Sequence, residues 1–304
     1  MTEAEARSKL EAILADLGVR RGDILYLAID MGQLPLPYFP AALSRKAFRE
    51  REQKWCEFLF DVLMDIVGAE GTILAPTFTY AYAAHQKPYI HEESPSETGP
   101  FTEFLRRRPE AVRSLHPLHS VVGIGAHAAE LLEGLKGKAA YGALSVFARL
   151  ETVNVRFLCL GASLGASLTY AHHLEQLYGV NHRYTKIFNV PVLCDGAEVT
   201  GPWLCFMKYL GTPIRANVHA LEHYMRSQGT LRVSELWDHP AQLAERIDVE
   251  NAAFTMLAEN PWAFTKEPIE IHIETNDTRP QMAHHTAVRF YPAAHEPGVS
   301  EKER

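Results

Sequence analysis

Two patterns of apolar and polar positions divide this chain into short strands and longer helices. Compact apolar runs bounded by glycine, proline or polar residues predict strands, at residues 24–29, 71–80, 121–125, 155–160, 186–195, 203–209 and 269–273. Apolar residues spaced three and four apart predict amphipathic helices, at residues 3–17, 46–67, 101–108, 126–135, 217–227 and 240–258. This alternation predicts an α/β fold of three layers, α/β/α, with helices on both faces of a central mixed sheet.

The pattern weakens near the end of the chain. After the strand expected at 269–273, the composition turns polar from Asn276 onward. Polar chain ends without apolar periodicity commonly fray. We therefore expect a single domain over residues 1–275 and a partly flexible C-terminal strand or tail over residues 276–304.

The most informative stretch runs from residue 155 to residue 175. An apolar strand ends in a turn rich in glycine and serine, and a helix is expected directly after it. Such a strand–loop–helix places polar groups at the carboxyl edge of a sheet. In the helix, Thr169, His172 and Glu175 follow one another at steps of three. They therefore share one helix face.

These three side chains are the parts of a general-base site. An imidazole can accept a proton, a carboxylate can orient that imidazole, and a hydroxyl can stabilise developing negative charge. A lone helical histidine is more often a packing residue, and we give that structural interpretation to His173, which should face elsewhere on the helix. We predict His172 as the base, Glu175 as its partner and Thr169 as a third catalytic residue.

Three segments together resemble the antibiotic N-acetyltransferase family, typified by aminoglycoside 3-N-acetyltransferases. The first is EGTILAPTFT at 70–79, and the second is RSLHPLHS at 113–120. The third is Leu-Gly at 160–161, followed by the row of Thr169, His172 and Glu175. Their order and separations match the family over most of the chain.

The resemblance implies an enzyme that uses acetyl-coenzyme A to acylate an amine by direct transfer, without a metal. It implies that His172 is the base, that Glu175 is its partner and that Thr169 lies near the reacting thioester. The coenzyme would lie along the first two segments, and the residues carried over as its contacts are Thr77, Ser114, His116 and Ser120.

Two departures from the family pattern leave the acceptor open. Family members usually carry a His-Ser-Ser-like triplet where Ala28-Ile29-Asp30 stands, and Ser-Pro where Ser145-Val146 stands. The acceptor amine could belong to an aminoglycoside, another amino sugar or a related natural product, and Tyr178 and Arg183 are candidates for contacting it. The alternatives are an acyl hydrolase or other acyltransferase with the same His/Glu pair, or a non-catalytic binding protein.

Composition disfavours several other classes of function. The chain has 304 residues, of which 47% are hydrophobic, and a formal net charge of −7. This suits a globular protein and disfavours a nucleic-acid binder. No apolar run approaches the roughly 20 residues that span a bilayer, and the first residues predict a polar helix and not a secretory leader. We expect a cytoplasmic protein without nucleic-acid or membrane partners, of a size compatible with a homodimer.

Cysteine and histidine spacing gives little support to a metal site. The four cysteines have no C-x-x-C spacing, which indicates reduced thiols. His116 and His119 could be grouped with His172 and Glu175 as metal ligands, but Pro117 prevents a regular helix there, and no second ligand pair has standard spacing. We therefore predict no metal.

Overall fold

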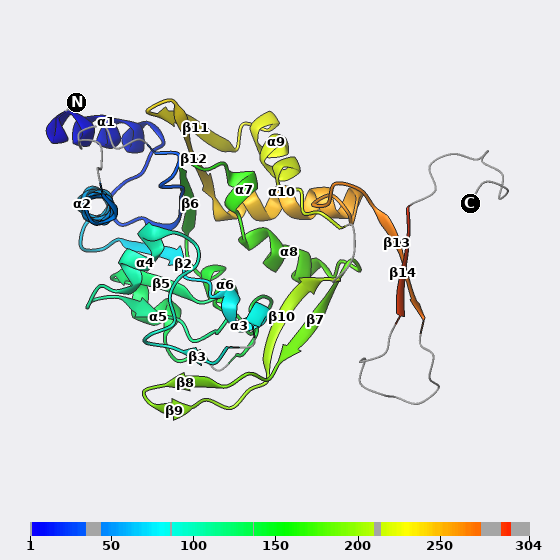
Figure 1. Ribbon diagram of the computed structural model, residues 1–304. Helices are drawn as coiled ribbons and strands as arrows, with labels where there is room; N and C mark the ends of the chain where they lie inside the picture. The colour runs from blue at the N-terminus through cyan, green and yellow to red at the C-terminus, as the bar shows by residue number, and fades with distance from the viewer. Residues whose placement is uncertain are drawn as a thin grey trace.

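The computed structural model describes residues 2–34, 44–85, 87–135, 137–209, 214–274 and 287–292, with residues 269–274 and 287–292 described by their backbone alone. Its centre is a mixed sheet of seven strands (Figure 1). In sheet order these are β11 (Leu231–Leu236), β12 (His239–Glu245), β6 (Val155–Leu160), β1 (Ile24–Ile29), β2 (Thr72–Pro76), β5 (Val121–Gly125) and β4 (Val112–Arg113). β6, β1 and β2 are parallel, and the other neighbouring pairs are antiparallel.

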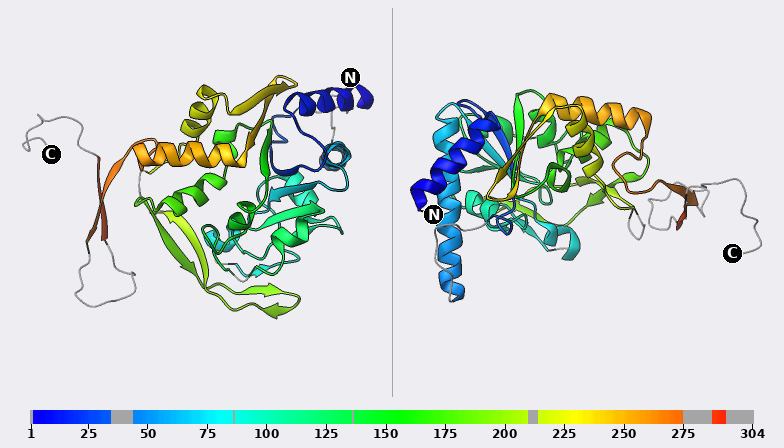
Figure 2. Two further views of the ribbon diagram at one scale, coloured as in Figure 1. Left: turned by 180° about the vertical axis from the view of Figure 1, so that it is seen from behind. Right: turned by 90° about the horizontal axis from the view of Figure 1, so that it is seen from above.

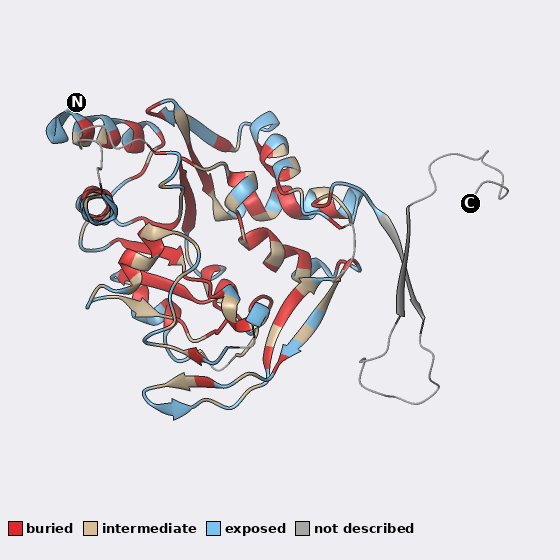
Figure 3. Cartoon of the chain, in the orientation of Figure 1, coloured by how far each residue is buried: buried red, intermediate tan, exposed pale blue. Residues whose placement is uncertain are grey.

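Side chains of the central strands alternate between two cores, as the pleat of a strand requires. In β1, Leu25 and Leu27 enter one core, and Tyr26 enters the other. The first core is completed by α1 (Glu3–Asp16), α2 (Arg45–Val67) and α4 (Pro100–Arg106). The second is completed by α5 (Ala128–Leu132), α6 (Val146–Leu150), α7 (Leu164–Ser167), α8 (Tyr170–Tyr178), α9 (His219–Ser227) and α10 (Arg246–Glu259). The predicted three-layer arrangement is confirmed, and Figure 3 shows the buried residues gathered along the central strands.

Smaller elements surround this sandwich. β7 (Arg183–Phe188) and β10 (Trp203–Lys208) form an antiparallel ribbon that is separate from the main sheet. β3 (Tyr89–Ile90), β8 (Val192–Cys194) and β9 (Ala197–Glu198) form a second small sheet, and α3 is Tyr80–His85. β13 (Ile269–Glu274) pairs with β14 (Ala287–Pro292), and this pair projects from the body in both views of Figure 2.

The boundary predicted at residue 275 falls between the two strands of the projecting pair. Residues 275–286 and 293–304 lie outside the described part of the chain. The division into a domain over 1–275 and a tail over 276–304 stays a prediction. The four cysteines are free. In the part of the chain that the structure describes, no helix combines the length and the apolar character needed to cross a bilayer.

The prediction of a helix over 240–258 is wrong in its first part. Residues 239–245 form β12, and α10 begins only at Arg246. β12 lies between β11 and β6 with Ala241, Gln242, Leu243 and Ala244 all buried, so both of its faces are covered. A run buried on both faces has no strand periodicity to distinguish it from a buried helix. Residues 81–99, where the sequence patterns predict neither helix nor strand, contain most of α3 and all of β3.

Candidate active site

The turn after β6 directs the chain onto the carboxyl edge of the sheet. Gly161 has a φ of +68°, and a Cβ there would lie 2.8 Å from the Asp30 carbonyl oxygen, so glycine is needed for the chain to leave the strand. Ser163 then caps the short helix α7 by accepting a hydrogen bond from the Ala166 N–H. Thr169 is the N-cap residue of α8, the helix that carries His172 and Glu175.

Glu175 is fully buried and lies at the centre of a charged cluster. His172 Nδ1 lies 2.7 Å from Glu175 Oε2, as the helical spacing predicted. His182 Nε2 lies 3.0 Å from Oε1, and Arg183 Nε lies 2.8 Å from Oε2. No sequence motif indicates a role for His182, and the sequence analysis makes Arg183 a candidate for contacting the acceptor. A stacked contact with Trp262 further orients the buried His182 ring.

The protonation states follow from these contacts. Burial alone would raise the pKa of Glu175, but the hydrogen bonds from His172 and His182 and the Arg183 charge hold it well below its usual range. The carboxylate is therefore ionised. It is the nearest partner of His172 Nδ1, at 2.7 Å, and accepts from Nδ1–H, while Arg183 Nη2 lies 2.9 Å from the same ring nitrogen. Burial, with help from the Arg183 charge, lowers the pKa of His172 against the opposing effect of Glu175. The imidazole is thus neutral near pH 7, and its Nε2 carries the free lone pair.

His172 lines a cavity of about 550 Å³, which we call the His172 cavity. Tyr80 of α3, His119 and Tyr141 form part of its wall. The β7–β10 ribbon contributes the rest of the polar lining and several apolar side chains: Arg183, Lys186, Phe188, Cys205, Phe206, Met207 and Lys208. A cavity of this size with few polar groups is typical of a small-molecule site.

A second cavity of about 560 Å³ lies at the carboxyl ends of β1 and β2, and we call it the Thr169 cavity. Its lining includes Thr169, the turn residue Ala162, and the carboxylate residues Asp30 and Glu97. Tyr80 lines both cavities. A smaller cavity of about 300 Å³ is lined by both Thr169 and His172. The predicted row of polar residues therefore stands where the two larger cavities approach each other.

Three of the predicted coenzyme contacts are buried hydroxyls that bond within the protein. Ser114 Oγ accepts from the Val121 N–H at 2.9 Å. Ser120 Oγ donates to the Thr77 carbonyl oxygen at 2.8 Å. The hydroxyl oxygens of Thr77 and Ser120 lie 3.0 Å apart. These bonds hold the connection between β4 and β5 against the end of β2. Contact of these hydroxyls with a coenzyme stays a prediction.

His116 is also predicted to contact the coenzyme and is buried. Its Nδ1 accepts from the N–H groups of His119 at 2.9 Å and Leu118 at 3.3 Å, and its Nε2 donates to the Leu204 carbonyl oxygen at 3.3 Å. Burial lowers the pKa of His116 to about 4, so the ring is neutral. Because both nitrogens are engaged, this ring offers no lone pair to a metal, and the metal site drawn through His116 is not supported.

Arg113 organises the loop that leads to both cavities. Its guanidinium donates to the carbonyl oxygens of Thr77, His91 and Ser94 at 2.7–3.0 Å and lies over the Tyr89 ring. These contacts fix the segment that carries Tyr80. The sequence showed Arg113 only as part of a family segment, because its partners lie up to 36 residues away along the chain.

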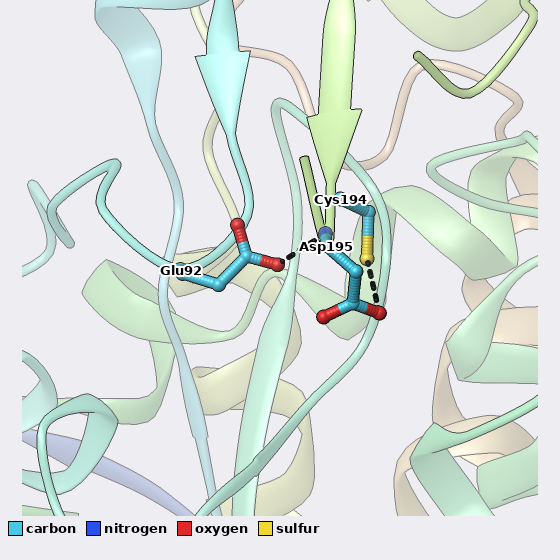
Figure 4. Close-up of side chains that lie close together, drawn as sticks. All are labelled: Glu92, Cys194 and Asp195. Atoms are coloured by element: carbon cyan, nitrogen blue, oxygen red, sulfur yellow. Dashed lines mark hydrogen bonds between the residues drawn. The ribbon is translucent and has the colours of Figure 1, made fainter. Parts of the chain in front are cut away.

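One group of three possible metal ligands lies apart from the His172 cavity (Figure 4). Within the described ranges, Glu92, Cys194 and Asp195 bring one ligand atom each within 4.8 Å of one another. Glu92 and Asp195 are exposed, and a Glu92 carboxylate oxygen accepts from the Asp195 N–H at 2.8 Å. This hydrogen bond, between the turns that follow β3 and β8, accounts for the grouping without an ion.

Comparisons with known proteins agree on one family. The family model described as aminoglycoside 3-N-acetyltransferase matches residues 44–258. The chain is 28% identical over 211 residues to aminoglycoside N(3)-acetyltransferase IX of Micromonospora chalcea, covering 64% of this chain and 69% of the relative. It is 34% identical over 161 residues to aminoglycoside N(3)-acetyltransferase VII of Streptomyces paromomycinus, covering 47% of this chain and 56% of the relative.

Solved structures show the same fold. The aminoglycoside acetyltransferase AAC(3)-Xa superposes with a TM-score of 0.68 at 22% identity, covering 84% of this chain and 97% of that one. AAC-IIIb in a binary complex with CoASH gives 0.67 at 23% identity, covering 86% and 98%. Sisomicin-bound AAC-VIa gives 0.68 at 22% identity, covering 85% and 98%.

Proposed function

The chain belongs to the aminoglycoside 3-N-acetyltransferase family, and from this premise we propose that His172 is the general base for acetyl transfer from acetyl-CoA to an amine. The family resemblance carried by the three sequence segments is confirmed, and with it the prediction of an acyltransferase. One observation gives the strongest support to the proposed role of His172. Its imidazole bonds to a buried, ionised Glu175 while it lines a cavity large enough for a small acceptor.

The reaction needs a neutral amine, because an ammonium has no lone pair. The amine nitrogen attacks the thioester carbonyl carbon, and Nε2 of His172 accepts a proton from that nitrogen as the C–N bond forms. Glu175 stabilises the imidazolium, and the Thr169 hydroxyl stabilises the oxyanion, because the N–H groups of Gly161, Leu164, Gly165 and Ala166 in the preceding turn already donate within the protein. The C–S bond then breaks, and the imidazolium returns a proton to the thiolate. The products are an N-acetyl amide and free coenzyme A.

The positions of the base and of the oxyanion donors suggest where each substrate lies. The acceptor nitrogen must reach His172, which lines the His172 cavity and not the Thr169 cavity. Thr169 and the turn residue Ala162 line the Thr169 cavity. We therefore place the acceptor in the His172 cavity and the thioester end of acetyl-CoA in the Thr169 cavity. The CoASH complex of AAC-IIIb supports this choice of donor.

The test is amine-dependent release of thiol from acetyl-CoA. We expect free coenzyme A to appear in proportion to added amine, with the acetylated amine detected by mass spectrometry. An acyl hydrolase with the same His/Glu pair would instead release thiol and acetate at the same rate without amine. A binding protein would release no thiol with any amine.

The lowered pKa of His172 predicts the acid side of the pH profile. The neutral imidazole is the active form, so the fall in kcat that is caused by protonation of His172 should have its midpoint below the histidine's ordinary value of 6.5. Measuring the pH profile with two acceptors of different amine pKa distinguishes the fall caused by His172 from the fall caused by protonation of the acceptor. The fall caused by His172 should have the same midpoint pH with both acceptors. A shared midpoint above pH 6.5 would contradict the assignment of His172 as the base.

A further inference from the structure

We propose that the acceptor amine carries an anionic group, such as a phosphate, sulfate or carboxylate, which is bound by Lys186 and Lys208. This inference rests on the proposed function and specifies the substrate class of the same site. It departs from the multiply charged cations that the names of the relatives suggest.

The charges that line the His172 cavity are all positive. Its lining includes Arg183, Lys186 and Lys208 but no aspartate or glutamate. The charge of Arg183 is offset by its ion pair with the buried Glu175. Burial and the nearby histidines hold the pKa of His119 well below its usual range, so that ring adds no charge. The two lysines therefore give the cavity its net charge.

Neither lysine has its charge offset within the described part of the chain. Lys186 lies over the Phe188 ring, and Lys208 Nζ donates to the Ile214 carbonyl oxygen at 3.1 Å. No ion pair joins either ammonium to a carboxylate among the described residues. Of the undescribed stretches, 35–43 and 210–213 contain no aspartate or glutamate in their sequence, whereas 275–286 contains Asp277 and 293–304 contains Glu296, Glu301 and Glu303. As far as the described residues show, both ammonium groups are thus available to an anionic ligand.

The ribbon directs the lysines to the cavity from two strands. Lys186 lies on β7 opposite Cys205, and Lys208 lies on β10 opposite Arg183. Both register partners also line the cavity. An anionic group on an acceptor whose nitrogen faces His172 would therefore meet charge-assisted donors on the wall that the ribbon forms. An acceptor with several ammonium groups would meet like charges in a partly desolvated site.

The Thr169 cavity has the opposite charge, since Asp30 and Glu97 line it. The thioester end of acetyl-CoA is joined to an uncharged pantetheine arm, and the phosphates lie at the far end of that arm. These carboxylates therefore meet the neutral part of the donor. In the reverse arrangement, the lysines would bind the phosphates of the coenzyme, and a cationic acceptor would lie beside Asp30 and Glu97. In both arrangements the lysines bind an anionic group, so only experiment distinguishes them.

The test compares matched acceptors and charge variants. A 2-amino sugar, its 6-phosphate and a neomycin-type aminoglycoside are assayed at saturating acetyl-CoA, and the KM for acetyl-CoA is measured separately. Wild-type protein should prefer the phosphorylated amine in kcat/KM. Lys186→Gln and Lys208→Gln should each reduce that preference by about 10- to 100-fold, because each removes one charge-assisted contact. Glutamate at both positions should reverse the preference, and Lys9→Glu, on the exposed face of α1, is the control for net charge.

Two results would overturn the inference. One is a wild-type preference for the aminoglycoside over the anionic amine. The other is a raised KM for acetyl-CoA in the lysine variants with unchanged acceptor preference, which would assign the lysines to the coenzyme. If no amine supports thiol release, the proposed function fails, but the inference is still tested. Calorimetry should then show that the amino sugar phosphate binds wild-type protein more tightly than the amino sugar, and equal affinities would contradict it.

Discussion

Replacing His172 with alanine should lower kcat for acetyl transfer by about 10²- to 10⁴-fold, the usual contribution of a positioned general base. The variant loses Nε2, the proposed acceptor of the proton from the attacking amine. It should keep its fold, because Glu175 retains His182 and Arg183 as partners. The measurement is the initial rate of thiol release at saturating substrates, together with a thermal unfolding curve that checks the fold.

Two further results distinguish the loss of a base from general damage. Added imidazole should restore part of the rate of His172→Ala, because the histidine lines an open cavity that a small base can enter. His223→Ala removes an exposed histidine of α9 and should keep the wild-type rate. A wild-type turnover in His172→Ala would show that the base has been assigned to the wrong residue.

Replacing Glu175 with alanine should destabilise the protein by about 3–5 kcal/mol, the range seen when one partner of a buried ion pair is removed. The carboxylate is fully buried, and its loss leaves the Arg183 guanidinium without its counter-charge and the His182 ring without its acceptor. Activity should fall as well, because no group then fixes Nδ1–H of His172. Urea denaturation monitored by circular dichroism gives the free energy of unfolding.

The origin of this loss can be tested with two more variants. Asp65→Ala breaks an exposed ion pair with Arg7 and should cost about 1 kcal/mol or less. Adding Arg183→Leu to Glu175→Ala removes the unpaired charge and should recover part of the stability. If Glu175→Ala lowered the free energy of unfolding no more than Asp65→Ala does, the buried ion pair of Glu175 and Arg183 would not be a major source of stability.

The contact between His172 and Glu175 could be predicted because helix geometry alone makes residues three apart neighbours. Its surroundings could not. His182 and Arg183 reach Glu175 only because the chain turns back after α8 and enters β7. Likewise, the sequence shows hydroxyls at 77, 114 and 120 but not that each is engaged by a nearby strand or loop. Those hydrogen bonds depend on tertiary structure.

The fold was predictable where one face of an element is buried and the other is not. α2 has this pattern, and its predicted range of 46–67 nearly coincides with Arg45–Val67. β12 lacks it because neighbours cover both of its faces, and the neighbouring strand β11 was not predicted. The two cavities depend on loops between such elements, so their linings, including the opposite charges of Lys186 and Asp30, emerge only from the structure.

The β7–β10 ribbon belongs to a sheet of its own, whereas His172 stands on a helix packed against the central sheet. In the function proposed for this chain, proton transfer and acceptor choice are therefore assigned to different pieces of backbone, which meet where Arg183 of the ribbon pairs with Glu175. Exchanges on the ribbon can change which compounds an enzyme of this kind modifies while its proton-transfer machinery stays intact.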